Sequence, residues 1–133
     1  MLKQLSIYAE NKGALQAMTN ALYEAGINIW GSVTNDGAEY GINRMVVSDP
    51  DKAKEVLTEK GYLCRFVDVL AVEIEDKPGA LNTLLTALLD SNVNVDYTYL
   101  SFNRDSSTPV MILHTADPEE VEICLKAKGF KMV

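Results

Sequence analysis

Two short charged turns carry the residue types that could bind a small charged molecule. The chain reads ENKGAL at residues 10–15 and EDKPGAL at residues 75–81, each time between a strand-like run and a helix-like run. The first amides of a helix have no partner inside the helix, and the helix dipole adds positive potential there. Glycine in the turn allows a ligand to approach the backbone closely. A carboxylate is therefore a natural ligand at either helix start.

Side chains of the same turns offer groups for a second charge. Lys12 and Lys77 supply positive charge, whereas Asn11 and Asp76 can accept hydrogen bonds from an ammonium group. One segment thus provides partners for both ends of an amino acid. The same residues also make an ordinary loop and helix start that binds nothing, and on residue types alone this is the simpler interpretation.

An internal repeat places the two turns in equivalent positions. Residues 13–15 and 79–81 both read Gly-Ala-Leu, at an offset of 66. The same offset relates residues 27–29 to 93–95, and an offset of 68 relates Asp-Pro at 49–50 to Asp-Pro at 117–118. We interpret the chain as a tandem duplication, with repeats at residues 1–67 and 68–133.

Both repeats show the same succession of periodic patterns. Alternation of apolar and polar residues predicts strands, and apolar residues three and four apart predict helices. In the first repeat the expected order is strand 5–9, helix 14–25, strand 27–33, strand 42–47, helix 50–60 and strand 63–67. In the second it is strand 70–74, helix 81–88, strand 93–99, strand 110–115, helix 118–128 and strand 130–133.

This order predicts an α+β fold of the ferredoxin-like βαββαβ type, in two tandem copies. Each copy is expected to form an antiparallel sheet with both helices on one face. A unit of about 65 residues buries too little surface to be very stable alone. The copies, or two chains in a homodimer, are therefore expected to pack together. Because strand 63–67 continues through Asp68 into the next strand, exchange of edge strands between copies or chains stays an alternative.

Helix boundaries and buried faces follow from particular residues. The first helices are expected to bury one apolar stripe each. The stripes contain Ala14, Leu15, Met18, Ala21, Leu22 and Ala25 in the first repeat, and Leu81, Leu84, Leu85 and Leu88 in the second. Asp49 and Asp117, each followed by proline, are expected to cap the second helices. Gly26 and Asn92 are expected to end the first helices in the left-handed conformation.

Composition argues against several classes of protein. The net charge is −7, of which −6 falls on residues 68–133, and this field opposes binding to a nucleic-acid backbone. No apolar run is long enough for a signal peptide or a membrane span, which predicts a cytoplasmic protein without membrane contact. No cofactor-binding or catalytic motif appears, so we expect no cofactor and no enzymatic activity.

A few isolated residues have ordinary structural interpretations. Cys64 and Cys124 are expected to be small core side chains. His114, the only histidine, is expected to be packed or at the surface, because a lone histidine forms neither a triad nor a metal cluster. Tyr8 and Trp30 have the spacing of the sheet face away from the core. They indicate either contact with another copy or partner, or simple partial burial.

The repeated turns in their βαββαβ frame, each followed by Gly-Ile-Asn-Ile or Asn-Val-Asn-Val, resemble the ACT domain family. This resemblance covers essentially the whole chain. It implies modules that bind amino acids and regulate metabolic enzymes, with the ligand between paired domains. The implied ligand-binding residues are Asn11, Lys12, Gly13, Ala14 and Leu15 with Asn28 and Ile29, and Asp76, Lys77, Pro78, Gly79, Ala80 and Leu81 with Asn94 and Val95.

The leading hypothesis is a non-catalytic regulatory module that binds a small amino-acid-type ligand and signals to a metabolic enzyme. The alternative is a structural or regulatory subunit that acts through protein contacts without ligand. Since the first turn lacks the proline of the second, the two sites are expected to be unequal.

Overall fold

The computed structural model of the chain describes residues 1–9, 13–36 and 41–133. Contacts divide these residues into two compact units. The first unit is Lys3–Val67, and the second unit is Asp68–Val133 together with Met1–Leu2. Asn11 and Lys12, two of the predicted site residues, lie outside the described residues.

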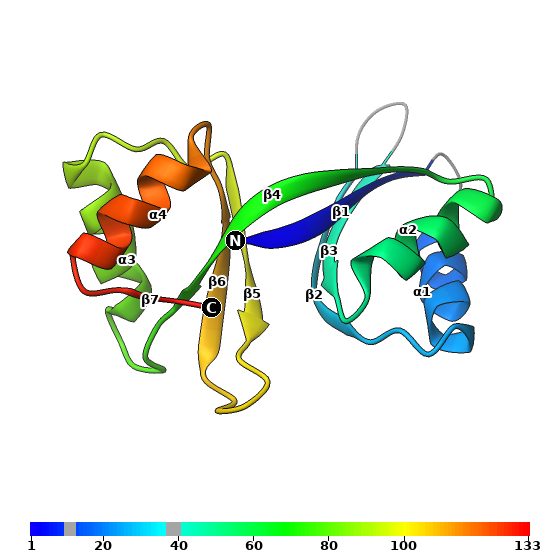
Figure 1. The fold of residues 1–133 in the computed structure, drawn as a ribbon, viewed down its shortest axis with the longest axis horizontal. Helices are drawn as coiled ribbons and strands as arrows, with labels where there is room; N and C mark the ends of the chain where they lie inside the picture. The colour runs from blue at the N-terminus through cyan, green and yellow to red at the C-terminus, as the bar shows by residue number, and fades with distance from the viewer. Residues whose placement is uncertain (10–12, 37–40) are drawn as a thin grey trace. The chain divides into compact units, whose positions relative to one another are not determined.

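The first unit contains four strands and two helices. In chain order these are β1 (Leu2–Ala9), α1 (Ala14–Glu24), β2 (Ile29–Asp36), β3 (Gly41–Val47), α2 (Pro50–Glu59) and the first part of β4 (Leu63–Glu73). Hydrogen bonding gives the strand order β2-β3-β1-β4, and β3 pairs with both β1 and β2 in antiparallel register. Figure 1 shows α1 and α2 together against this sheet.

The second unit repeats this arrangement. It contains the remainder of β4, then α3 (Ala80–Asp90), β5 (Tyr97–Phe102), β6 (Pro109–His114), α4 (Pro118–Ala127) and β7 (Lys131–Met132). Its strand order is β5-β6-β4-β7, with antiparallel pairing throughout, and α3 and α4 lie together against its sheet (Figure 1). The predicted ferredoxin-like fold in two tandem copies is therefore confirmed. One continuous strand, β4, closes the first sheet and opens the second.

Each unit has its own hydrophobic core between sheet and helices. Leu5, Ile7 and Leu22 are fully buried in the first, and Leu84 and Leu113 in the second. Neither core includes Tyr8 or Trp30, as their spacing predicts. The outward face of β1 is not solvated as a polar face would be, since Gln4 and Ser6 are also buried and hydrogen-bonded to each other at 3.2 Å.

The apolar stripes predicted for the first helices include residues that the sheet does not cover. Leu15 is 44% exposed, and Leu81 and Leu85 are each 38% exposed, although all three were expected to be buried. The buried positions of α3 are Leu84 and Leu88, which lie one turn apart. A single layer of helices on a sheet covers only the arc that faces the strands, so leucines on its flank stay in contact with solvent.

The helix ends follow the sequence signals with one exception. Gly26 and Asn92 have φ values of 73° and 58°, so both first helices end in the left-handed conformation as predicted. Asp49 caps α2 by accepting a hydrogen bond from the Lys52 amide at 3.2 Å. Asp117 occupies the same position before α4, but its side chain makes no capping hydrogen bond, contrary to the prediction.

Two strand predictions in the second repeat need correction. Strand β5 begins at Tyr97, because Val93 still belongs to the exit of α3 and its amide bonds to the Leu88 carbonyl at 2.9 Å. Strand β6 spans Pro109–His114, one residue earlier than predicted. The connection between them is closed by hydrogen bonds from the Asn103 amide to Thr108 and from the Ser107 amide to Asn103, both at 2.8 Å.

Candidate functional site

Two helices begin at a glycine without a side-chain cap. Gly13 and Gly79 precede α1 and α3 with φ values of 80° and 87°, a left-handed conformation that favours glycine. No side chain of the described residues caps either helix, whereas α2 is capped by Asp49. At a helix start of this kind, a first-turn amide that has no backbone partner can donate to an anion.

The EDKPGAL turn is held by its own backbone. The Lys77 amide donates to the Glu75 carbonyl at 3.1 Å, and the Ala80 amide donates to the Lys77 carbonyl at 3.2 Å. Thr83 donates to the Gly79 carbonyl from its amide at 2.8 Å and from its hydroxyl at 2.9 Å. These bonds fix the approach to α3 without using the side chain of Asp76.

A pocket of about 360 Å³, which we call the α3-start pocket, opens beside this turn. Its lining contains two carboxylates, two ammonium groups, two hydroxyls and an apolar part. The residues are Glu73, Ile74, Glu75, Lys77, Ala80, Thr83, Thr108, Gly129, Phe130 and Lys131. The size lies near the lower end of the range for small-molecule sites.

The charges of the α3-start pocket are arranged in two ion pairs. Lys77 Nζ lies 2.8 Å from Glu75 Oε2, and Lys131 Nζ lies 3.3 Å from Glu73 Oε2. The Lys77–Glu75 pair is largely exposed, so its net contribution is small and it can open for a ligand. The pocket thus offers both signs of charge, which suits a zwitterion better than a simple anion.

Glu73 is the most enclosed charged group of the α3-start pocket, with a side chain 14% exposed. Desolvation favours its neutral form, but hydrogen bonds from Lys131, Thr108 and Asn103 outweigh it and lower the pKa of Glu73 below its ordinary value of 4.5. The folded protein therefore keeps this carboxylate ionised and available to an ammonium group at neutral pH.

We expect Glu73→Gln to destabilise the protein at neutral pH and to have a smaller effect in acid. Because the folded pKa is lowered, the contribution of Glu73 is present above about pH 4.5 and is lost as the pH falls through the folded value. Urea unfolding of both proteins at neutral pH and at about pH 3 measures this difference. Glu119→Gln, which removes an exposed carboxylate outside the pocket, is the control. Equal stability of Glu73→Gln and wild type at both pH values would contradict the expectation.

The predicted residues of the second repeat lie in two places. Lys77 and Ala80 line the α3-start pocket, and Gly79 forms the start of α3. Asn94 lies at the opposite end of α3, where its neighbours in the fold are Ser91 and Thr115. The other members, Asp76, Pro78, Leu81 and Val95, do not line the α3-start pocket. Within one unit, therefore, the loop and the start of the second strand do not meet.

The first repeat gives a less complete picture. Gly13 starts α1, and Ala14 is buried against the core while Leu15 is exposed. Ile29 packs against the first core. The exposed Asn28 is fixed by its backbone, because its amide donates to Ser48 Oγ and its carbonyl accepts from the Ser48 amide, both at 2.9 Å.

Several residues of the α3-start pocket were not predicted. Glu73 and Lys131 face each other in the β4–β7 pairing, and Phe130 precedes Lys131 in the chain. The signal that could have found them is the strand order of the fold, which places the last strand of a βαββαβ unit beside its first. Local sequence patterns do not report this pairing, since 58 residues separate the two charges.

The isolated residues have structural roles. Cys64 is buried, and desolvation raises the pKa of its thiol. Cys124 is half-buried rather than part of the core, contrary to the prediction, and its thiol donates to Ser91 Oγ at 3.2 Å. His114 Nδ1 lies 2.8 Å from Asp96 Oδ2, and its ring stacks on Tyr97 with centroids 4.9 Å apart.

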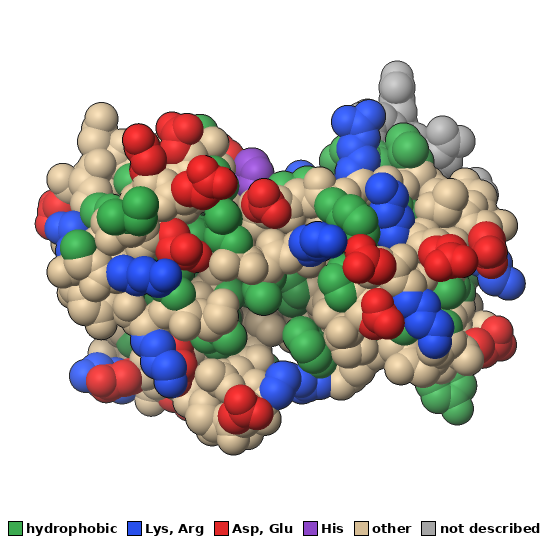
Figure 2. Space-filling view, viewed as in Figure 1, with side chains coloured by type: hydrophobic (Ala, Val, Ile, Leu, Met, Phe, Trp, Pro, Cys, Tyr) green, Lys and Arg blue, Asp and Glu red, His purple; other side chains and the backbone are tan. Residues whose placement is uncertain are grey.

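The described surface carries both signs of charge. On the face shown in Figure 2, lysine and arginine side chains are interspersed with acidic ones. Within residues 1–9, 13–36 and 41–133, no three His, Cys, Asp or Glu side chains gather as metal ligands. In the same ranges, no helix is both long and apolar enough to cross a membrane.

The fold and the glycine-led, uncapped helix starts define a pair of tandem ferredoxin-like domains with a candidate small-molecule site at a strand–helix turn. The chain belongs to the ACT domain family, since the model of the ACT domain pair matches residues 1–132. The resemblance noted from the repeated turns is thereby confirmed.

Solved structures share the fold. Protein BT0572 from Bacteroides thetaiotaomicron is 31% identical, with a TM-score of 0.90 over 99% of this chain and 91% of that one. The regulatory subunit of aspartate kinase from Thermus thermophilus, in its ligand-free form, is 16% identical, with a TM-score of 0.66 over 94% of this chain and 88% of that one. The corresponding subunit from Thermus flavus is 18% identical, with a TM-score of 0.60 over 96% and 91%. No curated protein matches the chain in sequence.

Proposed function

We propose that this protein is a non-catalytic regulatory module that binds a small amino acid at the start of α3 and signals to a metabolic enzyme. The observation that carries the proposal is the meeting of an uncapped helix start with a mixed-charge pocket. Lys77 would bind the carboxylate at the uncapped start of α3, where the helix dipole adds positive potential. Glu73 and Glu75 would bind the ammonium group.

The regulatory part of the proposal rests on similarity of fold. Two of the structural relatives are described as regulatory subunits of aspartate kinase. At 16% and 18% identity they support a regulatory role for this architecture but not a particular ligand or enzyme. The regulated partner is proposed only as a class, an enzyme of metabolism.

The ligand is proposed to lie at an interface between domains. The α3-start pocket is open to solvent on one side, and Asn94 and Asn28 are exposed without lining it. An ACT unit of a second copy of the chain would bring such an asparagine to the ligand. Binding at an interface would favour one packing of the units over another, which is how a partner could sense the ligand.

Thermal unfolding with each of the twenty amino acids tests ligand binding. At about a hundredfold excess over the dissociation constant, a ligand is expected to raise Tm by about 5 °C or more. No shift with any amino acid at millimolar concentration would contradict the proposal.

Lys77→Ala is expected to weaken binding of the active amino acid about tenfold, because it removes one charge-assisted hydrogen bond to the carboxylate. Lys126→Ala is a matched control. Lys126 is 59% exposed and pairs with Glu122, much as Lys77 is 62% exposed and pairs with Glu75. Calorimetric titration of the three proteins measures the difference. An equal loss in both variants, or in neither, would show that the carboxylate is bound elsewhere.

A second candidate function, a subunit that acts through protein contacts without ligand, is favoured by an apolar stripe on α3. Leu81, Leu85 and Leu89 occur at intervals of four residues and are 38%, 38% and 76% exposed. Edge strand β5 adds Leu100 and Phe102, each 50% exposed. Apolar surface of this kind typically marks contact with another protein, and we propose a second copy of the chain.

Leu89→Glu is expected to convert a homodimer into a monomer, because it places a charge in the proposed contact without changing the core. Light scattering after size-exclusion chromatography measures the mass of both proteins. Tyr23→Glu, at an 80% exposed apolar position on α1, is the control. A wild-type monomer at high protein concentration would contradict the proposed dimer.

A further inference from the structure

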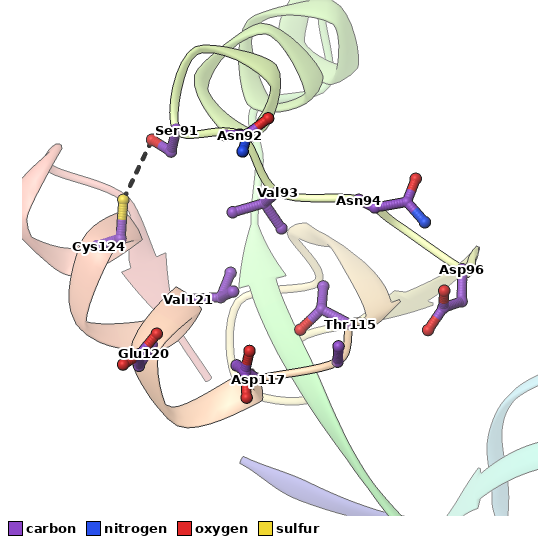
Figure 3. A pocket seen from close by; sticks show the side chains of 11 residues that line it. Ser91, Asn92, Val93, Asn94, Asp96, Thr115, Asp117, Glu120, Val121 and Cys124 are labelled. Carbon is purple, nitrogen blue, oxygen red and sulfur yellow. Dashed lines mark hydrogen bonds between the residues drawn. The ribbon is translucent and has the colours of Figure 1, made fainter.

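A second pocket lies at the other end of α3, between the last turn of that helix and the first turn of α4 (Figure 3). Its volume is about 380 Å³. We call it the α3–α4 pocket; its main polar residues are Ser91, Asn94, Thr115, Asp117, Glu120 and Cys124. It shares no lining residue with the α3-start pocket, so the two pockets are separate sites within one unit.

Thr115 is a buried polar group without a partner. Its residue surface is 3% exposed, and its Oγ1 has no hydrogen-bond partner in the described part of the chain. In Figure 3 this hydroxyl is directed into the pocket, on the side of Asp117 and Glu120. Buried hydroxyls are normally hydrogen-bonded, because an unpaired one costs free energy. The pocket therefore contains a hydroxyl that no described residue satisfies.

Two carboxylates beside Thr115 are also unpaired. The side chains of Asp117 and Glu120 have no hydrogen bond or ion pair with any described residue. Asp96, the third carboxylate of the lining, is already bound to His114. The unpaired groups thus combine one hydroxyl with two negative charges, and all three can accept hydrogen bonds.

In the first repeat, the chain itself closes the equivalent position, which lies between the end of α1 and the start of α2. Lys52 Nζ donates to the Ala25 carbonyl, at the end of α1, at a distance of 2.8 Å. The Asn28 amide donates to Ser48 Oγ at 2.9 Å. Val47, which precedes Ser48, is buried, and its side chain has no polar atom. In this repeat an ammonium group of the protein, that of Lys52, bridges the two helices.

The second repeat changes each of these closing residues. At the equivalent positions, 68 residues later, Glu120 replaces Lys52, Ala116 replaces Ser48 and Thr115 replaces Val47. The ammonium group is gone, its position has become a carboxylate, and the apolar wall has gained a hydroxyl. Together these changes remove the hydrogen bonds that close this position in the first repeat, and they replace its positive charge by a negative one.

We propose that the α3–α4 pocket binds a small primary ammonium compound, whose charged group takes the place that Lys52 Nζ holds in the first repeat. An ammonium group has three donors, which match the hydroxyl of Thr115 and the carboxylates of Asp117 and Glu120. A carboxylate ligand is disfavoured, because both unpaired charges are negative. A divalent cation fits less well, since the described residues offer no cluster of three metal ligands.

Ethanolamine hydrochloride is the probe, with ethylene glycol as its uncharged analogue and magnesium chloride as the metal. Amide chemical shifts of the intact protein are recorded during each titration. Ethanolamine is expected to shift the signals of Thr115, Asp117 and Glu120 with a dissociation constant on the order of 1 mM, as befits so small a ligand. Ethylene glycol and magnesium are expected to leave them unchanged. A response to magnesium alone, or to none of the three, overturns the proposal.

Glu120→Lys restores the first-repeat residue and is expected to raise the dissociation constant of ethanolamine about tenfold or more. Glu119→Lys makes the same charge change on the same helix outside the pocket and is expected to keep binding. Equal loss in both variants would mean attraction to the general surface charge and would overturn the site.

Thr115→Val tests the site without any change of charge. It restores the first-repeat residue Val47 and removes the unpaired hydroxyl, so Tm is expected to stay the same or rise while ethanolamine binding weakens several-fold. Unchanged ethanolamine affinity in a folded Thr115→Val protein would overturn the role of this hydroxyl. The amino-acid titration, which follows the signals around Gly79, is a separate test. A negative result in one titration does not decide the result of the other.

Discussion

Alanine in place of Leu84 is expected to lower the free energy of unfolding by about 3 kcal/mol. Leu84 is fully buried in the core of the second unit, where α3 packs on the sheet. Truncation removes apolar contacts and leaves a cavity that the surrounding strands fill only in part. The loss is large relative to the total stability of a domain of this size.

The neighbouring Leu85 provides a matched comparison. It lies in the same helix and is 38% exposed, so Leu85→Ala is expected to cost about 1 kcal/mol or less. Helix propensity changes equally in both variants and cancels in the difference. Urea unfolding followed by circular dichroism measures both values. Both values are measured at a protein concentration at which the chain is monomeric, and similar losses there would contradict the difference in burial between Leu84 and Leu85.

Valine in place of Gly79 is expected to destabilise the protein by about 2 kcal/mol or more and to abolish amino-acid binding at α3. The φ value of Gly79 is 87°, a conformation in which a β-branched side chain collides with its own backbone. An added Cβ would meet no other atom within 4 Å, so the cost arises from the backbone alone. Relief of the strain would rotate the first-turn amides of α3 away from the turn.

Gly79→Asn separates the backbone requirement from the need for a small residue. Asparagine adopts the left-handed conformation more readily than other side chains, so this variant is expected to lose about 1 kcal/mol or less. Thermal unfolding and amino-acid titration of both variants provide the comparison. Equal losses for valine and asparagine would contradict a requirement for positive φ.

Backbone-level features of the fold were predictable from the sequence. Gly26, Gly61 and Gly129 all have positive φ and end helices, as their place after the apolar periodicity indicates. The alternation of apolar and polar residues located the strands. Because the same pattern occurs in both repeats, two stretches of sequence support each strand. The strand order then followed from the βαββαβ succession, because few topologies accommodate it.

Side-chain exposure was less predictable. Leu81 and Leu85 belong to the apolar stripe by spacing, yet both are exposed. Periodicity reports which residues share a face of the helix, but it does not report how much of that face the sheet covers. The difference matters for function, since the uncovered leucines make up the proposed contact with a second copy.

The candidate site was predictable only where it is local. The turn with Lys77 and Gly79 was found from a stretch of seven residues, whereas Glu73 and Lys131 join it through strand pairing. Thr115 and Glu120 carried no signal by themselves. They become candidate site residues only when the second repeat is compared with the first, where Lys52 donates to the Ala25 carbonyl at the equivalent position.

The two repeats have diverged in ways that affect both pockets. Proline is present only in the second turn, and the α3-start pocket lies beside that turn. The α3–α4 pocket also belongs to the second repeat, where the closing lysine has become Glu120. Both proposed ligand sites therefore lie in the second repeat.

The most direct test of the central claim is an amide chemical-shift titration with the amino acid that raises Tm most. The account predicts that the largest changes fall on Lys77, Gly79 and Ala80, and that Lys77→Ala reduces them while Lys126→Ala does not. Changes confined to other parts of the chain, or saturable binding that leaves the start of α3 unaffected, would contradict the account.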